Sequence, residues 1–172
     1  MKYYISDLHL FHENAIEFDH RPFTSLQEMH DTILMNWNER VTNGDMVYIL
    51  GDVSMRGKKE DLIAFVAQLK GRKVLIKGNH DDVSDYRYQQ LFHEIYDYKE
   101  MHDTVGKEHY SLVLSHYPIL AGAAWEVAES SSMGILTKAK KTVFINNVWQ
   151  KCKHLIVGMS MMGNYVPIMW AV

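Results

Sequence analysis

Short hydrophobic runs alternate with two amphipathic stretches in the first half of the chain. The runs at residues 2–6, 46–50 and 73–76 have the length of buried strands, and polar residues follow each of them. Between the runs, apolar side chains recur at helical spacing up to about residue 40 and again over 59–70. The order strand, helix, strand, helix, strand predicts a parallel or mixed sheet with helices packed on it.

Both amphipathic stretches carry signals for the ends of helices. Thr24 or Ser25 can cap the first helix, and Glu28, three residues after Ser25, completes a capping box. This helix is expected to run to about Arg40. Gly71 is expected to end the second helix.

From about residue 93 the pattern changes to short, mostly extended segments. The segments expected to be extended are 94–100, 109–115, 133–136, 142–146, 153–158 and 165–170. No linker, repeat or low-complexity segment separates the two halves, so residues 1–172 are predicted to form one domain whose halves face each other across a site.

Composition and charge narrow the class of protein. The net charge of −3 does not suggest a general polyanion binder, so nucleic acid would have to be held locally, for example by Lys138, Lys140 and Lys141. A single cysteine, Cys152, fits a reducing compartment. The first residues show no secretory signal, and no apolar run approaches the ~20 residues of a membrane helix. We therefore expect a cytoplasmic protein with no membrane partner.

Polar side chains that bind metals or transfer protons follow each predicted strand. Taken singly, such loop residues are more often surface hydrogen-bonding groups, but an ordered set of them at strand ends favours one shared site. The set comprises Asp7 and His9, then Asp52, then Asn79, His80 and Asp81, and finally His116 after the run at 110–114.

These residue types suit a pair of divalent ions. Two ions held ~3.5–4 Å apart need a shared anionic ligand within a mixture of carboxylate, imidazole and neutral oxygen donors. Asp52 would be the shared ligand. Asp7 and His9 would complete one shell, and Asn79 and His116 the other. A water bridging both ions would become a hydroxide nucleophile near neutral pH, and the cations would neutralise charge on phosphate oxygens.

Three further residues have expected roles beside the ions. His80 is placed to protonate a leaving oxygen, and Asp81 could orient His80 and raise its pKa. His12 could reach a substrate, although a hydrogen-bonding role within the loop is an equal alternative.

At this point the sequence resembles the calcineurin-like metallophosphoesterases. The family motifs D-x-H, GD, GNH[DE] and a lone H stand here as Asp7-Leu8-His9, Gly51-Asp52, Gly78-Asn79-His80-Asp81 and His116. The resemblance implies a four-layer α-β-β-α sandwich, an α/β fold of two mixed sheets flanked by helices with the site loops at one edge. It also implies hydrolysis of phosphate esters.

The similarity extends to a branch of small, uncapped bacterial and phage phosphohydrolases, through residues 6–16, 21–23, 28–29 and 116–118. The loop from Gly51 to Gly57 also resembles a family pattern, GDxxxRG, whose arginine contacts phosphate in some branches. Arg56 is therefore a candidate for substrate binding, with a solvated loop arginine as the alternative.

The last family motif, G-H-x-H, is absent. By spacing after His116, Ile135 and Thr137 stand where the family has one ligand for each ion. Each ion would keep three protein ligands, counting Asp52 twice, where the family supplies four. Three protein ligands plus water are ordinary in catalytic zinc sites, so the loss weakens metal binding without forbidding it.

Three functional hypotheses follow. The first is a dinuclear phosphoesterase that uses two divalent ions, of Mn, Fe, Zn or Ni, to hydrolyse a small phosphomonoester or phosphodiester such as a nucleotide in an open groove. The second is a metal-poor, weakened family member that binds a phosphate-bearing ligand without efficient turnover. The third, a metal-dependent nuclease, is not favoured by the acidic net charge.

Overall fold

The computed structural model describes residues 1–105, 107–117 and 142–146. Its elements are β1 (Lys2–Ile5), α1 (Asn14–Phe18), α2 (Leu26–Arg40), β2 (Met46–Ile49), α3 (Lys59–Gln68), β3 (Arg72–Ile76), α4 (Tyr86–Gln89), β4 (Glu94–Tyr96), β5 (Lys99–Val105), β6 (Glu108–Ser115) and β7 (Thr142–Asn146).

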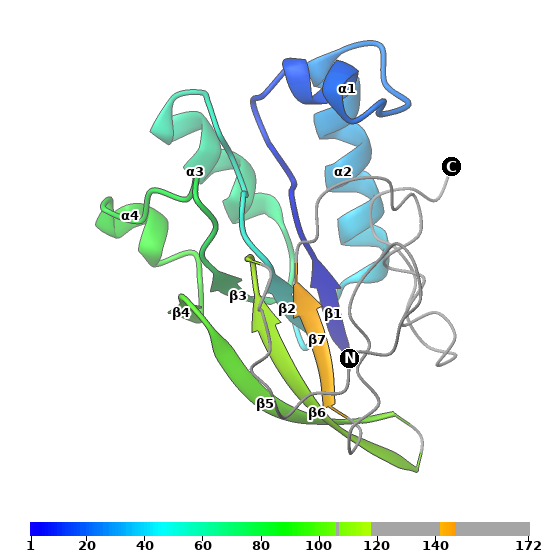
Figure 1. Cartoon of the computed structure of the whole chain (residues 1–172). Helices are drawn as coiled ribbons and strands as arrows, with labels where there is room; N and C mark the ends of the chain where they lie inside the picture. The colour runs from blue at the N-terminus through cyan, green and yellow to red at the C-terminus, as the bar shows by residue number, and fades with distance from the viewer. Residues whose placement is uncertain (106, 118–141, 147–172) are drawn as a thin grey trace.

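The first sheet has the order β1-β2-β3-β4, and its described strands are all parallel. Tyr4 of β1 pairs with Tyr48 of β2, which pairs with Val74 of β3. Because parallel neighbours require crossover connections, α2 and α3 join these strands, as the alternating pattern predicts. The carboxyl ends of β1, β2 and β3 therefore lie at one edge of the sheet (Figure 1).

Helix α2 covers one face of this sheet with a stripe of large apolar side chains. Met29, Ile33 and Trp37 recur at helical spacing and are fully buried in the core cluster shared with β1 and β2. The Oγ of Ser25 accepts the N–H of Glu28 at the start of the helix (3.2 Å). The return bond of the predicted capping box goes instead from the N–H of Thr24 to the Glu28 carboxylate.

A second sheet covers the opposite face of the first. Its order is β5-β6-β7, with β5 antiparallel and β7 parallel to β6. Leu112 and Leu114 of β6 are buried against Tyr4, Tyr48 and Val74. The described layers are thus helices, sheet and sheet, which confirms the predicted mixed α/β fold. The predicted fourth layer lies outside the described residues.

The structure differs from the sequence prediction in several elements. The segment predicted over 94–100 is two strands, β4 and β5, in different sheets. Helices α1 and α4 were not predicted, because a single turn is too short to show helical periodicity and depends on tertiary packing. The predicted segments 133–136, 153–158 and 165–170, with Ile135 and Thr137, lie outside the described residues.

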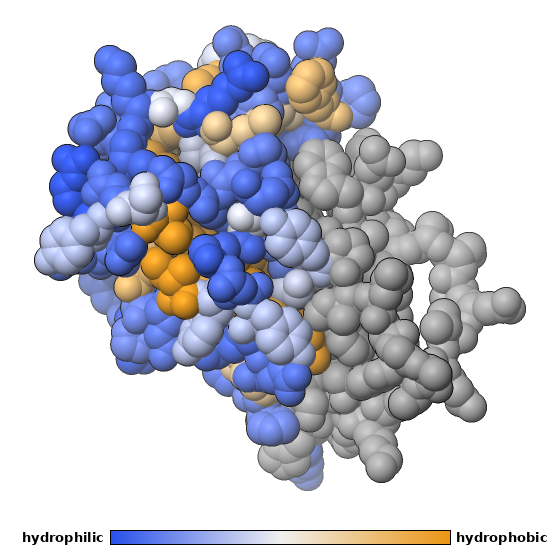
Figure 2. Space-filling view, turned by 60° about the vertical axis from the view of Figure 1, so that its left-hand side comes forward, coloured by the Kyte–Doolittle hydropathy of each residue, from blue (hydrophilic) through white to orange (hydrophobic). Residues whose placement is uncertain are grey.

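The described surface is mostly hydrophilic on the face shown in Figure 2, with small hydrophobic patches between the polar groups. Among the residues that the structure describes, no helix is both long and apolar enough to cross a membrane.

Candidate metal centre

The loops that follow β1 and β2 run side by side and carry the first three predicted ligands. The N–H of Asp7 donates to the carbonyl of Gly51 (3.1 Å), and the N–H of His9 donates to the carbonyl of Asp52 (3.0 Å). The parallel pairing of the two strands therefore continues into the loops. This pairing fixes the backbones from which Asp7, His9 and Asp52 project.

The same three residues have left-handed backbone conformations. Their φ angles are 53° at Asp7, 47° at His9 and 53° at Asp52. Residues with a Cβ seldom adopt this region, and local strain of this kind is typical of functional sites. The loop hydrogen bonds described above hold the backbone in this conformation.

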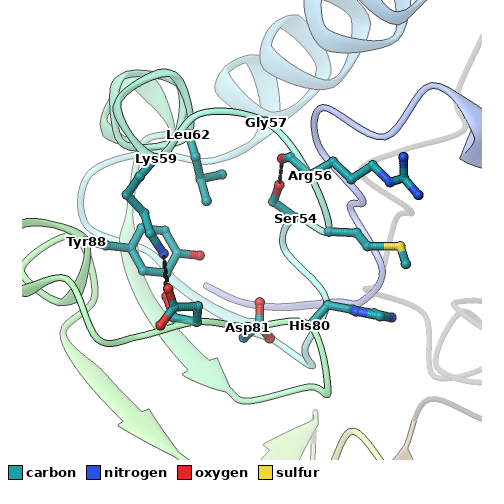
Figure 3. A pocket seen from close by; sticks show the side chains of 10 residues that line it. Ser54, Arg56, Gly57, Lys59, Leu62, His80, Asp81 and Tyr88 are labelled. Atoms are coloured by element: carbon teal, nitrogen blue, oxygen red, sulfur yellow. Dashed lines mark hydrogen bonds and ion pairs between the residues drawn. The ribbon is translucent and has the colours of Figure 1, made fainter.

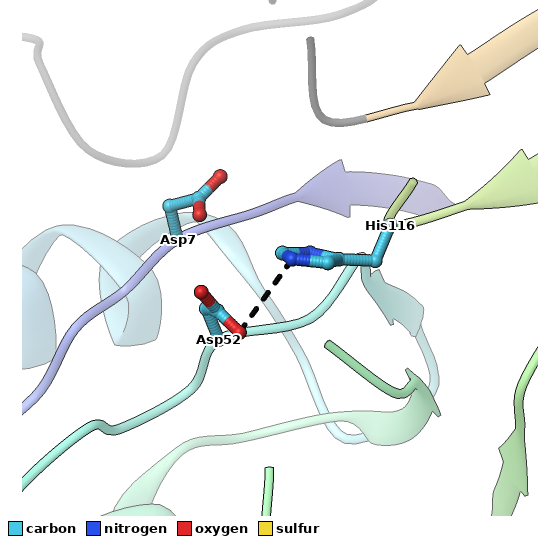
Figure 4. Close-up of side chains that lie close together, drawn as sticks. All are labelled: Asp7, Asp52 and His116. Atoms are coloured by element: carbon cyan, nitrogen blue, oxygen red, sulfur yellow. Dashed lines mark ion pairs between the residues drawn. The ribbon is translucent and has the colours of Figure 1, made fainter. Parts of the chain in front are cut away.

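Asp7, Asp52 and His116 converge at the centre of the site (Figure 4). Each offers a ligand atom, and these atoms lie within 4.8 Å of one another. The Oδ1 of Asp52 lies 3.6 Å from the Nε2 of His116, and its Oδ2 lies 3.9 Å from the Nε2 of His9. The two oxygens of Asp52 thus face two different histidines.

His116 is fixed by a hydrogen bond on one ring nitrogen. Its Nδ1 lies 2.9 Å from the carbonyl of Leu50, which can only accept, so Nδ1 is the donor. In the neutral imidazole the lone pair of Nε2 then points toward the Oδ1 of Asn79, 3.1 Å away, and toward Asp52. Electron-rich atoms that face one another in this way suit a cation between them.

Two further observations fit a bound cation. The Oδ1 of Asp7 is buried, lies 3.5 Å from the Nε2 of His9 and has no hydrogen-bond partner among the described residues, an arrangement that a bound cation between these atoms would stabilise. The close approach of the loops also requires glycine at two positions. A Cβ on Gly51 would overlap the His116 ring, and a Cβ on Gly78 would overlap the Asp52 carboxylate. The residues present therefore fit a metal centre.

Asp81 joins the loop after β3 to the loop after β2. Its Oδ2 accepts the N–H groups of Asp52 and Gly78 (both 2.8 Å), and its Oδ1 accepts the N–H of Val53 (3.0 Å). Burial raises the pKa of Asp81, and these three N–H donors oppose that rise. The carboxylate that was expected to orient His80 instead binds backbone groups, so Asp81 positions the Asp52 backbone.

His80 is attached to the centre through its backbone, since its N–H donates to the Oδ1 of Asp52 (3.2 Å). Its ring extends away from Asp81 (Figure 3) and lies 6.4 Å from the ring of His9. The side chain of Arg56 extends to the same side as the His80 ring, away from Tyr88. Arg56 is exposed and forms no ion pair with another described residue.

His12 lies beside the predicted metal ligands, with its ring 5.7 Å from that of His9. It is buried, and its Nδ1 has no hydrogen-bond partner in the described part of the chain. Burial lowers the pKa of His12, and the charges of His9 and Arg56 lower it further. The structure thus places His12 next to His9 at the edge of the centre.

Arg21 supports the first ligand loop and was not assigned a role from the sequence. Its buried guanidinium donates to the carbonyls of Asp7 (3.0 Å) and Leu8 (2.9 Å) and pairs with Asp19 (2.7 Å). It therefore holds the strained backbone at Asp7. The sequence signal was its place in the segment 21–23, which resembles the small phosphohydrolase branch.

His30 supports the other end of the same loop. Its Nε2 accepts the N–H of Phe11 (3.0 Å), and its ring packs between those of Phe11 and Phe65. Burial lowers the pKa of His30, which favours the neutral ring that can accept this bond. The only signal for His30 in the sequence was its position next to Met29, which lies on the buried face of the predicted helix.

A cavity of about 210 Å³ is lined partly by the loops that carry Arg56 and His80 (Figure 3). The hydroxyl of Tyr88 points into it, and the ammonium of Lys59 donates to the carbonyl of Asp82 at its edge (2.7 Å). The lining residues of the cavity are Ser54, Met55, Arg56, Gly57, Lys59, Leu62, His80, Asp81, Asp82 and Tyr88.

Comparison with known proteins agrees with this geometry. A gene 66 protein of Mycobacterium phage D29 is 32% identical over 129 residues, which cover 67% of this chain and 63% of the relative. An uncharacterized protein of Methanocaldococcus jannaschii, MJ1445, is 41% identical over 80 residues, 46% of each chain. The crystal structure of a protein of unknown function from Aquifex aeolicus, AQ665, superposes with a TM-score of 0.56 at 32% identity, over 72% of this chain and 64% of that one.

The chain spans less than two thirds of the length of each of these three relatives. The model of the calcineurin-like phosphoesterase family matches residues 3–150, which include β1 from its second residue, all of β2 to β7 and all the residues of the centre. The chain therefore belongs to the calcineurin-like phosphoesterase family.

Proposed function

We propose that the protein is a dinuclear metal-dependent phosphoesterase. The family implies metal-dependent hydrolysis of phosphate esters. The observation that carries the proposal for this chain is the convergence of Asp7, Asp52 and His116, with the Oδ1 of Asp7 buried and without a hydrogen bond among the described residues.

The orientation of Asp52 supports its role as a shared ligand. Because its two oxygens face His9 and His116 separately, the carboxylate could bind one ion on each side. The proposed ligands are Asp7, His9 and Asp52 for one ion, and Asp52, Asn79 and His116 for the other. This mixture of carboxylate, imidazole and amide donors suits Mn, Fe, Zn or Ni.

The chain's own side chains would bind and orient the phosphate ester. The ions, when bound, would acidify a bridging water and neutralise charge on the phosphate oxygens. The guanidinium of Arg56, which has no ion pair among the described residues, would bind a phosphate oxygen, and His12 would donate a further hydrogen bond. His80, whose backbone is fixed by Asp52, would hold the proton that the leaving oxygen takes up.

The proposed substrate is a small phosphomonoester or phosphodiester, and the proposed location is the cytoplasm. A weakened member that binds such a ligand without efficient turnover is the second candidate. It is favoured by one observation, which is that Ile135 and Thr137 stand where the family has histidines.

The function is tested by Mn²⁺-dependent hydrolysis of bis-p-nitrophenyl phosphate and p-nitrophenyl phosphate. Asp52→Asn removes the shared anionic ligand, so we expect activity to fall by more than about 100-fold, beyond the loss typical of a residue that only supports a ligand. Asp97→Asn changes an exposed carboxylate and should leave activity unchanged. Metal-dependent activity that survives Asp52→Asn would contradict the proposal.

The double substitution Ile135→His with Thr137→His separates the two candidates. An active wild type supports the phosphoesterase. An inert wild type together with an active double variant would show that the natural protein is the weakened, ligand-binding member.

A further inference from the structure

Phe18 places an exposed aromatic ring next to the candidate site. It is the last residue of α1, and 67% of its surface is accessible, although phenylalanine is usually buried. Its ring lies 6.5 Å from that of His12 in an edge-to-face arrangement. The same short helix buries Ala15 instead, so the Phe18 ring contributes little to the core.

The surroundings of Phe18 lead directly to the metal ligands. The His12 ring that contacts Phe18 lies 5.7 Å from the ring of His9. The side chain of Arg56 extends to the same side of its loop as the His80 ring (Figure 3), and that ring lies 6.4 Å from the ring of His9, so the guanidinium lies on this side of the site. An aromatic ring, a buried histidine and the candidate metal ligand His9 thus follow one another, and Arg56 offers a cation without an ion pair among the described residues on the same side.

We propose that Phe18 is a stacking platform for the base of a nucleotide substrate whose phosphate binds beside Arg56. The inference rests on the proposed function. A phosphate anchored at the cation and the metal ligands would hold its attached group near Phe18. Any nucleobase can stack on an exposed aromatic ring, because every base has a π-face. An aliphatic group would gain less there, since the neighbouring His12 and Arg56 are polar.

The charge of the chain favours a short nucleotide over a long strand. Proteins that hold long single strands follow the backbone with a positively charged groove. This chain has a net charge of −3. The substrate inferred here is therefore a mononucleotide ester or a dinucleotide, for which one cation and one stacking ring suffice.

The test compares two esters that release the same nitrophenolate. Thymidine 5′-(p-nitrophenyl phosphate) carries a base, and methyl p-nitrophenyl phosphate does not. Phe18→Ala should lower kcat/KM for the thymidine ester by about 5- to 100-fold, the range that corresponds to losing one base–aromatic stack. The methyl ester should change less than about twofold. Phe18→Trp should retain hydrolysis of the thymidine ester.

Tyr86→Ala is the matched control, because Tyr86 is 66% exposed and lies on the different helix α4. It should change neither ester. If Phe18→Ala also leaves the thymidine ester unchanged while the wild type hydrolyses both esters, the inference is overturned and the phosphoesterase stands.

Calorimetric titration of the Mn²⁺-loaded protein with thymidine 5′-monophosphate tests the inference without turnover. If the wild type hydrolyses neither ester, the proposed function fails. The inference then holds only if the monophosphate binds the wild type and binds Phe18→Ala at least about fivefold more weakly. Equal binding to both proteins, or binding to neither, would overturn it.

Discussion

At the scale of single residues, Asp52 connects all three strand-end loops. Its carbonyl accepts the N–H of His9, its own N–H donates to Asp81, and its Oδ1 accepts the N–H of His80. One residue thus receives bonds from the loop after β1 and from the loop after β3. Its carboxylate is positioned before any ion binds, and such preorganisation is what a catalytic metal site requires.

Asp81→Asn tests the backbone contacts that hold Asp52. An amide has one oxygen where the carboxylate has two, so its NH₂ group would face a buried N–H donor from Val53 or from the pair Asp52 and Gly78. We expect the free energy of unfolding to fall by about 1–3 kcal/mol. Urea titration measures the change, with the exposed Asp97→Asn as the control. Equal stabilities of the two variants would show that these contacts are unimportant.

His30 gives the fold a predictable dependence on pH. Burial lowers its pKa, so the folded state binds a proton less readily than the unfolded state. Its contribution to stability is complete above the unfolded pKa of about 6.5 and is lost as the pH falls toward the lowered folded pKa. For one group the loss cannot exceed about 1.4 kcal/mol per pH unit.

The comparison of His30→Gln with the wild type isolates this effect. The amide oxygen of glutamine can accept the N–H of Phe11 but does not titrate. Unfolding free energies at about pH 7.5 and about pH 5.5 should differ less in His30→Gln than in the wild type. His93→Gln alters an exposed histidine and should keep the wild-type difference. A pH dependence that His30→Gln leaves unchanged would refute this assignment.

At the scale of elements, the strands and long helices were predictable, and the supports of the loops were not. The hydrophobic runs located β1, β2 and β3, and the polar residues after them are the proposed ligands. Arg21 contacts Leu8, 13 positions earlier in the chain, and His30 contacts Phe11, 19 positions earlier. Both contacts form only in the folded chain. Local sequence patterns do not contain that information.

Gly78→Ala tests the close approach of these loops. A Cβ at this position would overlap the Oδ1 of Asp52 and approach its backbone nitrogen, so the loop after β3 would have to move away. We expect Mn²⁺ affinity, measured by calorimetry, to fall at least about tenfold. Gly44→Ala is the control because the nearest atom to its Cβ would be the Oγ1 of Thr42 at 3.9 Å. Unchanged affinity in Gly78→Ala would show that the loops are not tightly apposed.

At the scale of the whole molecule, the site is completed by the packing of the two sheets. The first sheet supplies Asp7, His9, Asp52 and Asn79, whereas His116 follows β6 of the second sheet. Leu112 and Leu114 of β6 are buried against the first sheet and so bring His116 to Leu50 and Asn79. The sequence placed His116 after a strand, but only the structure shows which sheet carries it.

The central claim, a centre of two ions that share Asp52, is tested most directly by metal stoichiometry. Calorimetric titration with Mn²⁺ should give two ions per wild-type chain. Because Asp52 serves both, Asp52→Asn should weaken both binding events, and Asp97→Asn should weaken neither. A wild type that binds no metal, or two ions bound equally well by Asp52→Asn, would contradict the account.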